Sequence, residues 1–179
     1  MTARLDHVGL YVWNLPRMTA FYVDTFGLVV TDEGRMTAFP HNLAFLTGEA
    51  TRHHQLVLVS GRPAEASFST VMQLSFKVDS LDQLREVTRR AEANGASEMS
   101  AVSHGNAWST YCRDPEGNTV EIYADTPWHV PQPFGKRLDL SKDDREIHSE
   151  TEALCRATPG FRPRAEWSAD LAETISATR

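Results

Sequence analysis

Three polar residues of types that bind metal ions stand within alternating apolar segments of the chain: His7, Gln73 and Glu121. In each segment the apolar residues share one parity, so the polar residue faces the opposite side of the expected strand. Polar groups on a half-buried face need partners. One imidazole, one amide and one carboxylate on a rigid sheet suit a divalent metal with open positions for water and substrate. A hydrogen-bonded polar cluster is the alternative interpretation.

A second set of side chains could support acid–base chemistry near this face. His53 and His54 begin a predicted strand, and two neighbours on a strand point to opposite faces, so we expect only one of them to reach the site. His104 precedes a turn glycine. By strand alternation, the Tyr111 side chain is expected to face the site, where it would either contact a ligand or belong to the core.

Hydrophobic periodicity predicts the elements that position these residues. A strand at 5–12 is followed by a helix that opens at Asn14-Leu15-Pro16 and ends at Gly27. A second helix at 81–94 follows the cap Asp79-Ser80. Further strands are predicted at 28–32, 42–47, 55–60, 71–78, 98–104, 107–113 and 119–124.

The same order of one strand, one helix and three strands occurs twice. A shift of 66 residues places His7-Val8-Gly9-Leu10 over Gln73-Leu74-Ser75-Phe76 and Leu15 over Leu81. We therefore predict an α+β fold in which two paired βαβββ modules form a cup-shaped mixed sheet. Its helices cover the outer face, and the concave face is left for a ligand.

The composition changes near residue 127. We expect one domain at 1–127, with modules at about 4–62 and 70–126, and a partly helical C-terminal extension at 128–179. The prolines within 125–134 predict irregular backbone there. A charged helix is expected at 141–156 and a short helix near 169–175.

Overall composition excludes several classes of protein. The chain has 179 residues, 41% hydrophobic and 23% charged, with a net charge of −6. An acidic chain without a basic run predicts no nucleic-acid binding, and the short apolar runs predict no membrane span. Two distant cysteines and no secretory signal favour a cytoplasmic protein.

The segments LDHVGLYVWNLPRMTAFYVDTFGL and HGNAWSTYCRDPEGNTVEIY resemble the opening module and closing hairpin of the vicinal oxygen chelate superfamily. This superfamily includes glyoxalases, bleomycin resistance proteins and extradiol dioxygenases. The segments HHQLVLV and DTPWHVPQPF are similar to its small single-domain extradiol ring-cleavage enzymes. The resemblance covers about residues 4–135.

The resemblance implies a role for each candidate residue. His7, Gln73 and Glu121 match the metal ligands, although Gln73 stands where an extradiol enzyme has a histidine. His54 matches the acid–base histidine, Tyr111 the substrate-binding tyrosine, and His104 a further histidine of the site. The implied cofactor is Fe(II), with Mn(II) or another divalent ion as the alternative.

The implied function is extradiol cleavage of a biphenyl-diol-like aromatic diol by dioxygen. Members of the superfamily often dimerise, and the C-terminal extension is long enough to supply a homodimer interface. Gln73 weakens the prediction of ring cleavage because a neutral amide is a poorer iron ligand than imidazole. Two alternatives therefore stay open. One is a glyoxalase-like metal-dependent isomerase or lyase, and the other is a non-enzymatic protein that binds an aromatic small molecule.

Overall fold

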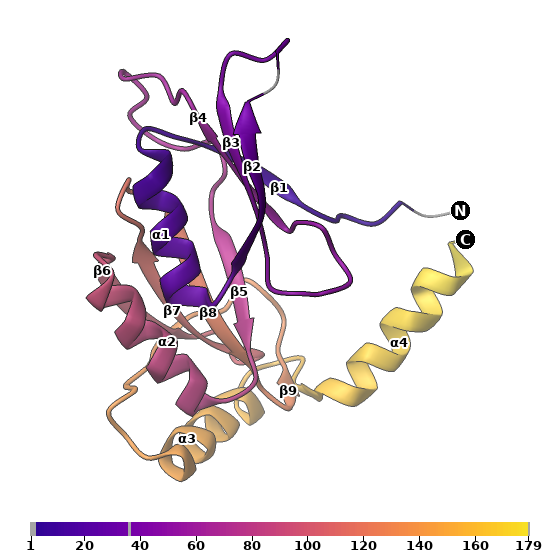
Figure 1. Cartoon of the computed structure of the whole chain (residues 1–179). Helices are drawn as coiled ribbons and strands as arrows, with labels where there is room; N and C mark the ends of the chain where they lie inside the picture. The colour runs from indigo at the N-terminus through magenta and orange to yellow at the C-terminus, as the bar shows by residue number, and fades with distance from the viewer. Residues whose placement is uncertain (1–2, 36, 179) are drawn as a thin grey trace.

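The structure is a computed structural model that describes residues 3–35 and 37–178. Two helices and eight strands form the main body, and short strands and two more helices complete the chain (Figure 1). Their bounds are β1 (Val8–Val12), α1 (Leu15–Phe26), β2 (Val29–Arg35), β3 (Asn42–Thr47), β4 (Leu56–Ser60), β5 (Leu74–Val78), α2 (Leu81–Ala93), β6 (Ser97–Ser103), β7 (Ala107–Arg113), β8 (Thr119–Asp125), β9 (Trp128–His129), β10 (Lys136–Arg137), α3 (Asp144–Arg156), β11 (Arg162–Pro163) and α4 (Arg164–Ala177).

The two modules have the same topology, which confirms the predicted fold class. One sheet has the order β1-β4-β3-β2, and the other has β5-β8-β7-β6 with β10 added beside β6. The first strand of each module pairs in parallel with the fourth. A shift of 66 residues carries the bounds of β1 onto those of β5 and the first residue of α1 onto that of α2. The strands hydrogen-bond as two separate main sheets, one in each module, and not as one continuous sheet.

Local signals in the sequence set the ends of both helices. The Asn14 side chain accepts a hydrogen bond from the backbone N–H of Arg17, and Gly27 ends α1 with a left-handed φ of 69°. Ser80 caps α2 by accepting from the backbone N–H of Gln83. The predicted strand at 71–78 begins later, at Leu74, and Met72 before it is largely exposed.

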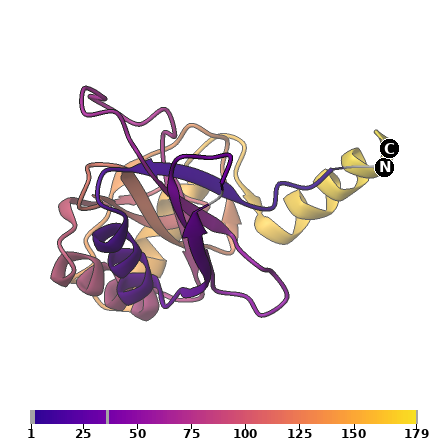
Figure 2. The same ribbon diagram turned by 45° about the horizontal axis from the view of Figure 1, so that its top comes forward.

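The helices α1 and α2 lie side by side on one side of the sheets (Figures 1 and 2). They cover the strand face on which the apolar side chains lie. Leu10 and Val12 of β1 are buried, and so are Val120 and Ile122 of β8. Across the module boundary the rings of Phe26 and Phe76 stack with centroids 3.8 Å apart. One hydrophobic core therefore serves both modules, and the opposite parity is left for polar side chains.

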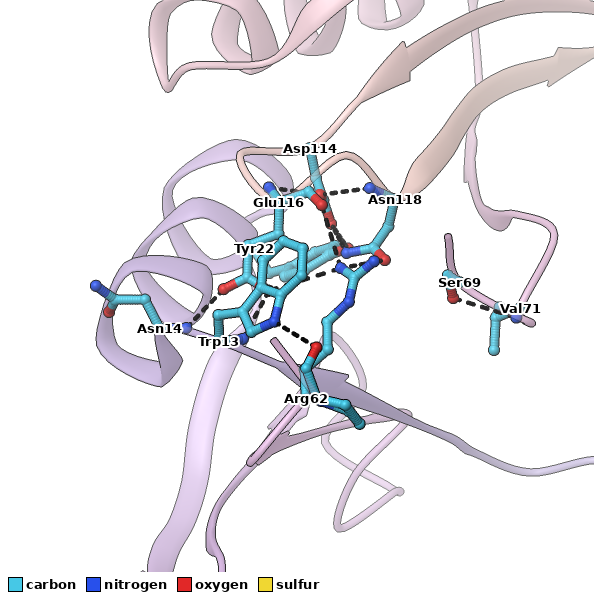
Figure 3. Close-up of polar contacts among 10 residues, drawn as sticks. Trp13, Asn14, Tyr22, Arg62, Ser69, Val71, Asp114, Glu116 and Asn118 are labelled. Carbon is cyan, nitrogen blue, oxygen red and sulfur yellow. Dashed lines mark hydrogen bonds and ion pairs between the residues drawn. The ribbon is translucent and has the colours of Figure 1, made fainter. Parts of the chain in front are cut away.

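The turn between β7 and β8 joins the second module to the first (Figure 3). The hydroxyl of Tyr22 donates to Asp114 Oδ2 at 2.9 Å. The backbone N–H groups of Trp13 and Asn14 donate to the two Glu116 carboxylate oxygens at 2.8 and 2.6 Å. These bonds hold one end of β1 against the turn and fix the two sheets relative to each other.

Arg62 lies at the same junction (Figure 3). Its guanidinium donates to the backbone oxygen of Glu116 and to Asn118 Oδ1, and it stacks 4.0 Å from the centroid of the Trp13 ring. The segment after β4 is thereby attached to the β7–β8 turn as well.

The C-terminal extension is more ordered than the prolines suggest. The segment at 125–134, expected to be irregular, contains β9, which pairs antiparallel with β11. The helix α3 begins at Asp144, because Asp143 caps it. The helix α4 spans 164–177 and not only 169–175, buries no residue, and projects away from the body (Figures 1 and 2). Among the described residues, no helix combines the length and apolar character required to span a membrane.

Candidate functional site

Glu121 is the centre of a polar network on the face of the second module opposite the helices. Its neighbours Val120 and Ile122 are buried in the core, so the alternation of β8 turns its side chain to the other face. Each carboxylate oxygen accepts two hydrogen bonds. Ser109 and Tyr111 donate to Oε1 at 2.8 Å each, and Gln73 and Ser75 donate to Oε2 at 2.8 and 2.7 Å. Four donors fill the acceptor capacity of the carboxylate.

Gln73 takes part in this network through its amide nitrogen. Nε2 donates to Glu121 and also lies 2.8 Å from Ser75 Oγ. The opposite orientation would bring the amide oxygen against the carboxylate, where two acceptors repel each other. Within the described part of the chain, Gln73 Oε1 makes no hydrogen bond. The predicted pair of Gln73 and Glu121 is therefore in direct contact.

Tyr111 and His104 extend the network along β7. The Tyr111 oxygen lies 2.9 Å from His104 Nε2, and His104 Nδ1 lies 2.7 Å from the carbonyl oxygen of Phe134. Burial, followed by the hydrogen bond to Glu121, raises the pKa of the Tyr111 phenol well above its usual value. The phenol therefore stays protonated and acts as a donor at physiological pH.

His7 and His54 form a second group, on the first module. Their rings contact each other with centroids 4.3 Å apart, and the side chain of His7 is 50% exposed. Loss of solvent contact, then the charges of His7 and His53, lower the pKa of His54. A lowered pKa keeps His54 neutral near physiological pH, which is the form that accepts a proton.

Strand alternation led us to expect that His53 and His54 point to opposite faces. Instead, their side chains are in contact. The Nδ1 atoms of the two rings lie 2.9 Å apart, and His53 Nε2 lies 2.7 Å from Asp32 Oδ2. The reason is that β4 begins only at Leu56, so neither histidine is constrained by its alternation.

Two hollows lie beside these groups. One of about 330 Å³ is lined by residues of the second module and the extension, among them Ser75, Tyr111 and Glu121. The other, of about 650 Å³, is lined from the first module by Leu5 and Val8, which flank His7, and from the second by Gln73 and Ser75. Ser75 lines both hollows, so the two hollows adjoin there, whereas the lining of neither includes His7 or His54.

The family resemblance implies a divalent metal at this site. Among the described residues, no cluster of three or more histidine, cysteine, aspartate or glutamate side chains is arranged to hold a metal. The set of His7, Gln73 and Glu121 offers imidazole nitrogen, amide oxygen and carboxylate oxygen, a set suited to divalent ions. The Gln73 oxygen is free of protein hydrogen bonds, and Glu121 would exchange one of its four donors for a metal. The chemistry of this set suits such an ion once the Gln73 amide turns over, but none of the contacts among the described residues joins His7 to Gln73 or Glu121.

Three further side chains belong to these two groups although they were not among the predicted site residues. Ser75 and Ser109 share the parity of Gln73 and Tyr111, so strand alternation is a signal that could have found them. Asp32 gave no such signal, because its strand is irregular where it lies.

Comparison with known protein families gives a match over most of the body. Residues 4–122 match the family model of the Glyoxalase/Bleomycin resistance protein/Dioxygenase superfamily. The chain is 32% identical over 170 residues to Biphenyl-2,3-diol 1,2-dioxygenase 3 of Rhodococcus globerulus, covering 92% of this chain and 80% of the relative. It is 25% identical over 128 residues to Biphenyl-2,3-diol 1,2-dioxygenase 2 of the same organism, covering 69% of this chain and 64% of that relative.

Solved structures share the fold of the body. The fosfomycin resistance protein FosX of Listeria monocytogenes, crystallised with Mn(II) and sulfate, has a TM-score of 0.55 and 24% identity. The match covers 70% of this chain and 95% of FosX. A glyoxylase/bleomycin resistance protein/dioxygenase domain from Frankia has a TM-score of 0.58 and 19% identity, over 70% of this chain and 100% of the domain.

Proposed function

The chain belongs to the Glyoxalase/Bleomycin resistance protein/Dioxygenase superfamily, and from this premise we propose that it is an extradiol ring-cleavage dioxygenase acting on a catechol-type aromatic diol. In this reaction both atoms of dioxygen enter the product, and the ring bond beside the two hydroxyl-bearing carbons breaks. A biphenyl-diol-like compound is the proposed substrate.

The main support for this proposal is how much of the chain matches the biphenyl-diol dioxygenase of Rhodococcus. The match to FosX covers 70% of the chain, whereas the match to the diol dioxygenase of Rhodococcus covers 92% and so runs into the C-terminal extension. The extension contributes to the candidate site, since Gln132 lines the hollow beside Glu121 and the Phe134 carbonyl contacts His104. Similarity that includes these residues favours the biphenyl-diol dioxygenases over the fosfomycin resistance proteins as a guide to function.

The roles follow from the chemistry of each group. We assign to His54 the acceptance of a proton from one substrate hydroxyl, because its lowered pKa leaves it neutral. Tyr111 keeps its proton, which would turn from Glu121 to the bound substrate, and His104 holds the phenol in place. A divalent metal held by His7, Gln73 and Glu121, Fe(II) in the first instance and Mn(II) or another ion as alternatives, would supply the redox chemistry between diol and dioxygen.

The experiment is an anaerobic purification and Fe(II) reconstitution, followed by oxygen-consumption assays with biphenyl-2,3-diol. We expect turnover in the wild type, and in His54→Ala a loss of about 10²–10⁴-fold in kcat with the same metal content. His41→Ala, which changes a histidine of the same module outside the network, should turn over normally. Absence of oxygen uptake with any catechol, in protein shown to contain iron, would overturn the proposal.

A second candidate function is favoured by the saturation of Glu121. Its four protein donors satisfy the carboxylate without a metal. Such a site could bind an aromatic diol through hydrogen bonds alone. Diol binding by calorimetry in metal-free protein, unchanged on adding Fe(II) or Mn(II) and without oxygen uptake, would identify this function.

A further inference from the structure

A chain of hydrogen bonds leads from the surface of the first module to His54. Asp32 Oδ2 lies 2.7 Å from His53 Nε2, and His53 Nδ1 lies 2.9 Å from His54 Nδ1. The His54 ring also contacts the ring of His7, with centroids 4.3 Å apart. The chain therefore ends at the histidine to which the proposed function assigns proton transfer.

With His53 neutral, counting protons along this chain of hydrogen bonds leaves one arrangement. An ionised carboxylate can only accept, so His53 Nε2 carries the proton that points at Asp32. A neutral imidazole has one N–H, so His53 Nδ1 is an acceptor. His54 Nδ1 must then be the donor, and His54 Nε2 keeps an unprotonated lone pair.

We propose that Asp32 and His53 are positioning residues that hold His54 in the tautomer with hydrogen on Nδ1 and a free lone pair on Nε2. The role of this lone pair as a base rests on the proposed function. The tautomer itself is inferred from the hydrogen bonds and does not depend on that function. A histidine whose other nitrogen is held by a hydrogen-bond partner is fixed in both tautomer and ring orientation.

The strand β2 has an irregularity that brings Asp32 to this position. The pairing of β2 with β3 runs regularly from Val29 to Val30, then skips Thr31, so that Asp32 lies opposite Phe45. In a regular ladder Thr31 would take that place and Asp32 would turn to the other face, because a shift of one residue reverses every side chain. A β-bulge that re-aims a side chain beside a site is a known device.

Phe45 supports the two histidines from the same strand pair. Its ring lies 5.7 Å from that of His53 and 5.1 Å from that of His54, edge-on to both. Ala44 and Leu46 on either side are buried in the core, so Phe45 stands on the opposite face with Asp32. The bulge, the aromatic support and the hydrogen bonds therefore converge on one ring.

The side chains of Asp32 and His53 are 68% and 55% exposed, so their interaction adds little to folding stability. The consequence to measure is the state of His54. Long-range ¹H–¹⁵N NMR on the full-length, metal-free protein reports which ring nitrogen of each histidine carries hydrogen. The spectrum should be taken at a pH well above the usual histidine pKa of about 6.5.

We expect the wild type to show hydrogen on Nδ1 of His54. Asp32→Ala and His53→Phe should shift His54 toward the other tautomer, whereas Asp32→Asn, which keeps an acceptor oxygen, should retain the wild-type pattern. Glu33→Ala, the neighbouring carboxylate on the opposite face of β2, is the matched control and should change nothing. Hydrogen on Nε2 of His54 in the wild type, or an unchanged pattern in Asp32→Ala, would overturn the inference.

Kinetics separate this inference from the proposed function. With an active enzyme, Asp32→Ala should lower kcat by about 10–100-fold with little change in KM, and Asp32→Asn should restore most of it. If His54→Ala leaves turnover unchanged, the proposed role of His54 fails while the tautomer result stands. If the tautomer is wrong, the inference fails whatever the activity.

Discussion

Individual side chains decide how this site would treat a metal. The amide nitrogen of Gln73 donates to Glu121 and to Ser75, and its amide oxygen is a weaker metal ligand than imidazole. Strand parity placed Gln73 and Glu121 on one face, where they are in contact, whereas the hydrogen bond between Tyr111 and His104 was not predicted. The contact of His53 with Asp32 was not predicted either, because both histidines precede their strand and Asp32 follows a bulge.

Replacing Gln73 by histidine tests the ligand assignment. The variant offers an imidazole nitrogen and removes one of the four donors that occupy Glu121, so Fe(II) affinity should rise by about tenfold or more, given the stronger donor. Anaerobic competition with a coloured chelator measures it. Gln83→His, on the exposed side of α2, is the control. An affinity equal to that of the wild type would show that Gln73 is not a ligand.

The two cysteines should be unreactive in the folded protein. Burial, followed by the charge of Asp114, raises the pKa of the Cys112 thiol to about 11, and burial also raises the pKa of Cys155. A raised pKa means less thiolate, the reactive form, at any pH below it. Labelling with a disulfide reagent at mildly alkaline pH should be slow in native protein and complete in denaturant. Rapid native labelling of either thiol would contradict this burial.

Elements of both modules meet at the β7–β8 turn, whose hydrogen bonds join the modules in addition to their shared core. Helix caps and strand parity could be predicted because they depend on neighbouring residues, such as Asn14, Ser80 and Gly27. The bulge in β2 and the bond between Tyr22 and Asp114 depend on contacts between distant segments. No local pattern encodes them, which is why the sequence did not reveal them.

Tyr22→Phe measures the strength of this junction. Tyr22 is fully buried, and its hydroxyl donates to Asp114, itself only 2% exposed. Removing the hydroxyl leaves a buried carboxylate short of one donor, which should lower the free energy of unfolding by about 1–3 kcal/mol. Denaturant unfolding gives the value. Tyr11→Phe, at a half-exposed tyrosine, should change it by no more than about 0.5 kcal/mol. An equal loss of unfolding free energy in the two variants would show that the hydrogen bond from Tyr22 to Asp114 does not stabilise the junction.

At the scale of the whole molecule, the extension has two parts with different relations to the body. β11 pairs with β9, and the backbone N–H of Arg164 donates to the Pro127 carbonyl at 2.9 Å. Beyond these contacts α4 projects from the fold, with Trp167 stacked on His129 at 4.5 Å between ring centroids (Figure 1). The body and β11 form one packed unit, to which α4 is attached at its first turn.

Two truncations separate these parts. A chain ending at Trp167 keeps β11, Arg164 and the stacked tryptophan but loses the rest of α4, none of which is buried. Its free energy of unfolding should therefore stay within about 0.5 kcal/mol of the full chain. A chain ending at Thr158 also loses the partner of β9 and the Arg164 bonds, and it should be less stable by about 1–3 kcal/mol, since carbonyl groups near the core lose their donors.

Circular dichroism with denaturant, at two protein concentrations, compares the three chains. The chain that ends at Trp167 should show a smaller helical signal than the full chain, with the same unfolding midpoint. A loss of several kcal/mol in that variant, larger at the higher concentration, would mean that α4 packs against a second copy of the chain, because only an associating protein gains stability with concentration. A loss independent of concentration would place the stabilising contact of α4 within its own chain. Either loss would contradict the isolated position of this helix.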